Sequence, residues 1–136
     1  MSLVNNIGIG IIKIARDFLE KNCPLEKKPE LKICKEDNRA VDVEGDLVLS
    51  ATGEPSENGW RFNRVKGNMI CSHSKVDHMS GFPIIVEGDF DISFSLIKSL
   101  QGCPDEVWGN FICTGCGFTE EQVREACPNI GGKIYC

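Results

Sequence analysis

The sequence has no surplus of positive charge. Lys and Arg together number 15 against 20 Asp and Glu, which gives a net charge of −5 at pH 7. Proteins that recognise nucleic acid cluster basic residues on one face, because contacts with the phosphate backbone supply much of the affinity. The chain also contains no long run of like charges. We therefore expect no nucleic-acid partner.

A long uninterrupted apolar run is missing as well. The N-terminal segment MSLVNNIGIGIIKIARDF is apolar at its centre, but no basic residue precedes that centre, and Lys13, Arg16 and Asp17 follow it closely. A signal peptide begins with a basic region, and a membrane-spanning helix needs about 20 mostly apolar residues. The expected location is therefore cytoplasmic, without a membrane partner.

Motifs of common catalytic sites are absent from the sequence. There is no G-x-S-x-G, no phosphate-binding loop and no H-E-x-x-H. Asp77, His78 and Ser80 are close together in the sequence, but they lie on a repeating segment where alternate residues are expected to face water. His73 and His78 flank a turn and are likewise expected to be solvated. We therefore expect no enzyme activity, no catalytic residue and no cofactor.

What the chain does contain is an eight-residue phrase that recurs. VKGNMICS at 65–72, VEGDFDIS at 86–93 and VWGNFICT at 107–114 start 21 residues apart, and related phrases start at 43 and 130. Apolar residues and Gly occupy alternate positions, which is the period of a strand with one buried face. The predicted inward columns are Val43, Val65, Val86, Val107 and Ile130; Leu47, Met69, Phe90, Phe111 and Ile134; and Leu49, Cys71, Ile92, Cys113 and Cys136.

The segment between the phrases repeats too. VDHMSGFPIIV at 76–86 aligns with IKSLQGCPDEV at 97–107, so apolar residues, Gly and Pro recur at matching positions. Gly allows tight reversals and Pro restricts φ before the next strand. Self-similarity at this period predicts an α+β fold built on a short, right-handed β-solenoid of about four to five coils.

Together, the strands of the form V-x-G-[DN]-F-x-[CI]-S and the return legs of the form I-x-S-L-x-G-x-P-x-x-V resemble the short leucine-rich-repeat-like solenoid proteins of tailed phages and prophages. The resemblance covers residues 41–136. It implies a leucine-rich-repeat-like solenoid inside the cell that binds a protein. It carries over no catalytic residue.

The ends of the solenoid are expected to be capped, because terminal coils otherwise expose apolar edges. A helix at 3–21 would place an apolar stripe on the first coil, and a strand at 31–35, a turn at 36–38 and a returning strand would form a hairpin. The stripe consists of Val4, Ile7, Ile11, Ile14 and Phe18. Residues 1–42 would then be an N-terminal cap and residues 43–136 the solenoid, together one compact domain.

A second cap is predicted near the C-terminus. Thr119 and Gln122 form a capping-box pattern ahead of a short helix at 120–126. The last strand, 133–136, would close the stack and leave Cys136 inside the fold.

The eight cysteines are Cys23, Cys34, Cys71, Cys103, Cys113, Cys116, Cys127 and Cys136. We interpret those in the inward columns as small buried hydrophobes in the reduced state, because free Cys often replaces aliphatic residues in cores. The alternative is a structural zinc site on Cys113 and Cys116, whose two-residue spacing matches a zinc knuckle, with Cys103, Cys127 or Cys136 completing it. Structural zinc sites usually have two knuckles, so the predicted metal content is none.

Residues between the inward columns should face outward. The three outward rows are Glu44, Lys66, Glu87, Trp108 and Gly131; Asp46, Asn68, Asp89, Asn110 and Lys133; and Val48, Ile70, Asp91, Ile112 and Tyr135. For the Asp and Asn row, a ladder of side-chain hydrogen bonds is the favoured interpretation. The candidate partner-binding residues on this exposed sheet are Val48, Ile70, Glu87, Asp89, Asp91, Trp108, Ile112 and Tyr135.

Aromatic and aliphatic anchors among carboxylates suit a protein partner, especially a basic one. The expected function is non-catalytic recognition of a protein, and a phage or prophage origin would make a host protein the partner. Two alternatives remain open at this point. The N-terminal segment covers the outward rows, or a second copy of the chain does so in a homodimer or a self-associating structural protein.

Overall fold

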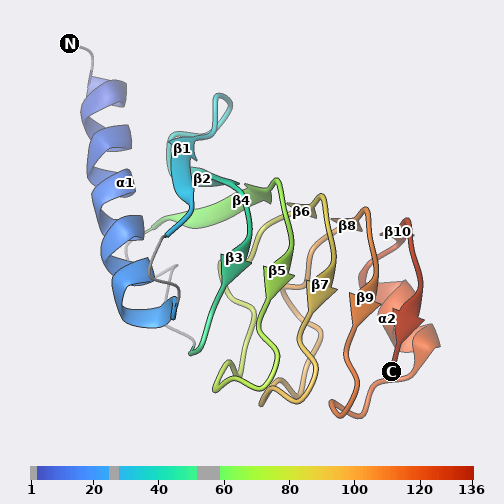
Figure 1. Cartoon of the computed structure of the whole chain (residues 1–136). Coiled ribbons are helices and arrows are strands. Elements are labelled where there is room, and N and C mark those ends of the chain that lie inside the picture. The colour runs from blue at the N-terminus through green and yellow to red at the C-terminus, as the bar shows by residue number, and fades with distance from the viewer. Residues whose placement is uncertain (1–2, 25–27, 52–58) are drawn as a thin grey trace.

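The computed structural model describes residues 3–24, 28–51 and 59–136, with side chains described from residue 10 onward. Helix α1 (Leu3–Asn22) lies at one end of a β-solenoid of about four turns, and helix α2 (Glu120–Ala126) lies at the other end (Figure 1). The predicted α+β solenoid with two capping helices is therefore confirmed.

Two sheets run along the solenoid. The six-stranded sheet has the order β1 (Glu30–Ile33), β2 (Ala40–Glu44), β4 (Arg61–Val65), β6 (Ile85–Val86), β8 (Glu106–Val107) and β10 (Asn129–Ile130). The five-stranded sheet consists of β3 (Leu47–Val48), β5 (Met69–Ile70), β7 (Phe90–Asp91), β9 (Phe111–Ile112) and β11 (Ile134–Tyr135). Each phrase therefore supplies two short strands to different sheets, and the prediction of one continuous exposed sheet is wrong.

The corner between the two strands of a phrase is formed by Gly followed by Asp or Asn. The Asp46 Oδ1 atom accepts a hydrogen bond of 2.8 Å from the backbone N–H of Asn68. Equivalent 2.8 Å bonds join each corner to the next as far as Lys133, which confirms the predicted ladder. Coils approach closely here, since a Cβ on Gly88 would lie 2.9 Å from the carbonyl oxygen of Gly67. Only Gly fits, because no side chain can occupy that space.

Equivalent side chains of successive coils stack to form the core. Phe90 and Phe111 occupy paired positions of β7 and β9, their ring centroids are 5.1 Å apart, and both are fully buried. Their edge-to-face geometry is the arrangement that aromatic rings prefer in cores. On the return legs, Val76 and Ile97 are also fully buried. The first four members of each predicted inward column therefore form the interior, whereas Ile130 and Ile134 of the last coil are only partly buried.

The N-terminal cap packs on the first coil. Helix α1 contacts β1 and β2, and its buried face is Ile11, Ala15 and Leu19, at a spacing of four residues. This face is rotated from the predicted stripe, because Ile14 and Phe18 are only partly buried; the side chains of Val4 and Ile7 lie outside the described ones. Within the described residues, no helix has the length and apolarity that a membrane crossing requires.

The predicted hairpin is present, with β1 pairing antiparallel to β2. Strand β2 also pairs in parallel with β4 of the solenoid. The proposed boundary between residues 42 and 43 therefore falls within a strand that belongs to both parts. The cap and the solenoid share one continuous sheet.

The C-terminal cap agrees with its sequence signal except at its last residue. The Thr119 side chain accepts the N–H of Gln122, and the Gln122 side chain accepts the N–H of Thr119, so the capping box is present. Cys136, expected inside the fold, is exposed. Strand β11 is the outermost strand of its sheet, so among the described residues no coil lies beyond it to cover that thiol.

Candidate functional site

The third outward row lies on the outer side of the five-stranded sheet, with Val48, Ile70, Asp91, Ile112 and Tyr135 in register on consecutive strands. We call these five residues the outer row. Tyr135 is 45% exposed and the other four are half-buried. Four members of the outer row therefore present apolar or aromatic surface in one line across the coils.

Asp91 is the single charged member of the outer row, and its orientation is held locally. Its Oδ1 atom accepts hydrogen bonds from the backbone N–H of Ser93 at 2.9 Å and from the Ser93 hydroxyl at 2.6 Å. These bonds place one carboxylate at the centre of a mainly apolar line. A partner that docks on the outer row would meet a negative charge there.

Two exposed apolar residues that follow Asp91 in the sequence were missed by sequence reasoning. Phe94 is 52% exposed and Leu96 is 53% exposed, and both follow β7 at a bend. Phe94 has a positive φ of 53°, as His73 does at 51° in the preceding coil, and the next coil has Gly115 there. The Phe94 ring stacks on His73 with a centroid separation of 4.9 Å. Gly115, at the equivalent position of the next coil, was the feature of the sequence that could have indicated a left-handed bend here.

Glu87 and Trp108 do not belong to the outer row. They contact Arg64 of β4, in the six-stranded sheet: Arg64 forms an ion pair with Glu87, and its guanidinium carbon lies 5.1 Å from the centroid of the Trp108 ring. The Trp108 Nε1–H donates a hydrogen bond of 3.3 Å to Glu106. Although Trp108 is 50% exposed, it lies with a different sheet from Tyr135.

Asp89 lies between these two groups, in the corner ladder. Its Oδ1 atom accepts the backbone N–H of Asn110 at 2.8 Å, and its own N–H donates to Asn68. The side chain therefore has a structural contact in the stack. The predicted binding set thus divides into the outer row, a corner residue and a pair beside the six-stranded sheet.

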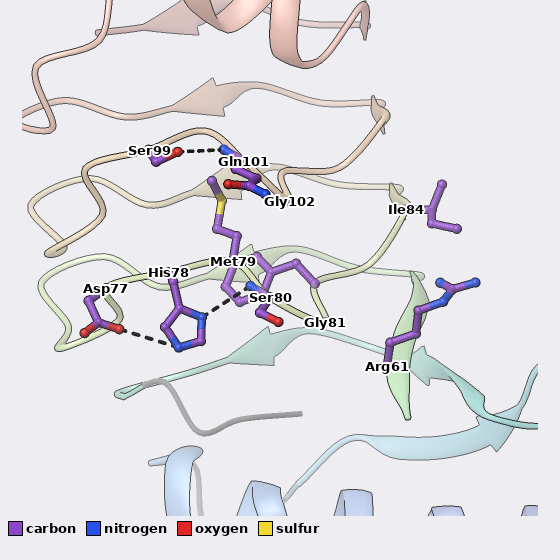
Figure 2. Close-up of a pocket in the computed structure, with 11 residues that line it drawn as sticks. Arg61, Asp77, His78, Met79, Ser80, Gly81, Ile84, Ser99, Gln101 and Gly102 are labelled. Atoms are coloured by element: carbon purple, nitrogen blue, oxygen red, sulfur yellow. Dashed lines mark hydrogen bonds and ion pairs between the residues drawn. The ribbon is translucent and has the colours of Figure 1, made fainter. Parts of the chain in front are cut away.

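The return legs form an open groove of about 840 Å³ that includes Asp77, His78 and Ser80 (Figure 2). The His78 Nδ1 atom accepts a 3.3 Å hydrogen bond from the backbone N–H of Ser80, and Nε2 lies 3.8 Å from Asp77. In a nucleophilic triad, the hydroxyl itself donates to the imidazole. Here Nδ1 is occupied by the main chain, so this ring nitrogen cannot serve as the base for the hydroxyl.

The cysteines of the inward columns have strongly raised pKa values where they are buried. Burial raises the pKa of Cys71, and burial together with the neighbouring Cys136 and Cys116 raises the pKa of Cys113 to about 12. The Cys116 thiol donates to the carbonyl of Ile92 at 3.2 Å. Within the described residues, no group of three His, Cys, Asp or Glu is arranged to hold a metal ion. The zinc alternative therefore has no ligand set in the described part of the chain.

Comparison of the chain with protein-family models, curated proteins and solved structures finds no match. No functional residue can thus be carried over from a relative. The function is therefore inferred from the surface of this chain, where three of the exposed large apolar or aromatic residues are Tyr135 of the outer row, Phe94 and Leu96.

Proposed function

We propose that this protein is a non-catalytic binding module that docks a protein partner on the outer row, with Phe94 and Leu96 as additional anchors. The observation that carries the proposal is the line of four apolar or aromatic side chains, with Asp91 at its centre, in register across five strands. A contiguous exposed apolar patch with a polar rim is typical of a protein interaction site. Phe94 and Tyr135 add aromatic side chains, which are enriched where interfaces gain most of their affinity.

The charge of the surface indicates the chemistry of the partner. Asp91 lies within the outer row, Asp46 and Asp89 lie in the adjacent corner ladder, and the chain carries a net charge of −5. Complementary charge raises association rates and disfavours wrong partners. The proposed partner therefore combines apolar side chains with a basic group opposite Asp91.

The origin of the partner rests on the resemblance to phage and prophage solenoid proteins alone. If the chain is encoded by a phage or prophage, the partner is a host protein in the cytoplasm. This part of the proposal is an analogy at the level of fold and carries no residue assignment.

The test uses matched variants on the two sheets. Ile70→Asn and Ile112→Asn place a polar residue in the outer row, where the fold already accepts Asp91. Trp108→Ala removes an exposed aromatic beside the other sheet and serves as the control. Immobilised wild-type chain and Trp108→Ala should retain the same protein from an extract of the source organism, whereas the two Asn variants should lose it with unchanged melting temperatures.

Three results would contradict the proposal. Equal retention by all variants would show that the outer row does not bind the partner, and loss with Trp108→Ala alone would move the site to the six-stranded sheet. A wild-type dimer in sedimentation that the Asn variants convert to monomer would show that a second copy of the chain covers the row.

A further inference from the structure

Two cysteines face each other across the last two strands of the five-stranded sheet. Ile112 of β9 pairs with Tyr135 of β11, and the Cys113 N–H donates a 2.8 Å hydrogen bond to the Tyr135 carbonyl. The parallel pairing therefore continues to the next position, where Cys136 lies opposite Cys113. Neighbouring strands are about 4.8 Å apart, which falls within the range of about 4.4–6.8 Å for the Cα atoms of a disulfide.

The side chains of this pair lie on the same side of the sheet, because residues paired on neighbouring strands point the same way. Cys113 is fully buried and Cys136 is exposed. The two thiols are also close enough to interact. Burial is the largest cause that raises the pKa of Cys113 to about 12, and the neighbouring Cys136 is the next. An accessible thiol thus lies beside a sheltered one.

We propose that Cys113 and Cys136 are a modification site at which a hydroperoxide converts the two thiols into an intrachain disulfide. The Cys136 thiol loses its proton, the thiolate attacks one peroxide oxygen, the O–O bond breaks, and the leaving hydroxide takes up a proton, so that a sulfenic acid and water form. The Cys113 sulfur then attacks the Cys136 sulfur, the S–O bond breaks, and the leaving hydroxide takes the Cys113 thiol proton and departs as a second water. In total, two thiols and one hydrogen peroxide give one disulfide and two waters, and two electrons pass from sulfur to the peroxide.

The geometry selects this pair over the other cysteines of the last two coils. Cys103 and Cys127 also lie near each other, but Cys127 is the C-cap of α2 and its N–H donates to the Val123 carbonyl, so it lies outside the strand pairing that aligns Cys136 with Cys113. Cys127 is fully buried and Cys103 is only partly exposed, with its pKa raised to about 12 mainly by burial, whereas Cys136 is exposed.

The cross-link would act on an edge strand of the solenoid. Strand β11 consists of two residues and pairs with β9 on one side. A covalent bond directly after it would hold the last coil to the preceding one, and opening of that coil would become rarer.

The experiment treats the reduced full chain with hydrogen peroxide, blocks the remaining thiols after denaturation, and maps the peptides by mass spectrometry. We expect a mass loss of about 2 Da, a linked peptide containing Cys113 and Cys136, and slower amide exchange at Ile134 and Tyr135. Cys136→Ser should abolish the linked peptide and the slower exchange, whereas Cys103→Ser should retain both. Cys136 is exposed, so its replacement should leave the fold intact.

Several outcomes would overturn the proposal. The pair is not a disulfide site if Cys136 oxidises further to sulfinic acid while Cys113 remains free to be alkylated. The same conclusion follows if the first bond joins Cys103 to Cys127, or if two chains become linked through Cys136.

Discussion

The stacked phenylalanine column can be tested by comparing one substitution at two levels of burial. Phe111→Ala removes a fully buried ring whose centroid lies 5.1 Å from that of Phe90. Truncating a buried Phe to Ala costs about 3–5 kcal/mol, because apolar contacts are lost and a cavity remains. Single domains have a free energy of unfolding of about 5–15 kcal/mol, so this loss is a large fraction of the total. Phe94→Ala makes the same chemical change at a ring that is 52% exposed, and should cost less than about 1 kcal/mol.

Urea unfolding followed by far-ultraviolet circular dichroism measures both losses. With a slope of about 2 kcal/mol per molar urea, Phe111→Ala should lower the midpoint by about 2 M and Phe94→Ala by less than about 0.5 M. Equal midpoints for the two variants would refute the stacked column as the source of stability. If the dependence of the unfolding free energy on urea changes together with the midpoint, the denatured state is altered. The two variants are then compared by hydrogen exchange in place of urea unfolding.

Three further predictions concern backbone spacing, the corner ladder and surface charge. Gly109→Ala should lower the free energy of unfolding in urea by more than about 2 kcal/mol, because the new Cβ would lie 2.8 Å from a carbonyl oxygen of the preceding coil. Gly10→Ala, whose new Cβ would have nothing within 4 Å, should instead stabilise helix α1 by up to about 1 kcal/mol. Asp89→Asn should preserve the melting temperature because it keeps the corner acceptor, while Asp89→Ala should lower stability by about 1–2 kcal/mol. The pKa of Glu44 is lowered, most of all by its 3.0 Å hydrogen bond with Lys66. The contribution of Glu44 to stability is therefore present above the ordinary carboxyl pKa and is lost as the pH falls through the folded-state pKa. Lys66→Met should raise the pKa of Glu44, as measured by a carboxyl titration followed by nuclear magnetic resonance.

The stacking of coils could be predicted because repetition appears directly in the sequence. Residues that recur at one position of every phrase must occupy equivalent places, so the sequence alone assigns Phe90 and Phe111 to one column. The Asp and Asn ladder followed from the same reasoning, and so did the capping box at Thr119. These features depend only on how far apart particular residues are along the chain, and the sequence gives those separations directly.

The candidate site was less predictable, because exposure depends on how the phrase bends. Period-two alternation separates inside from outside, but it does not show that the backbone turns at each Gly corner and enters a second sheet. Trp108 and Tyr135 were therefore assigned to one face although they lie with different sheets. Phe94 was overlooked because it follows a buried strand in an apolar segment, and only its left-handed backbone turns the ring outward.

Periodicity and composition were thus enough to establish a stacked β-solenoid, its buried columns and its two helical ends, since each depends on which residues recur and how far apart. The corner angle between sheets, the rotation of the buried face of α1 and the exposure of Cys136 arose only from packing in three dimensions. The physical reason is that a repeat specifies equivalence between positions, whereas the neighbours of a side chain are set by how every coil fits against the next.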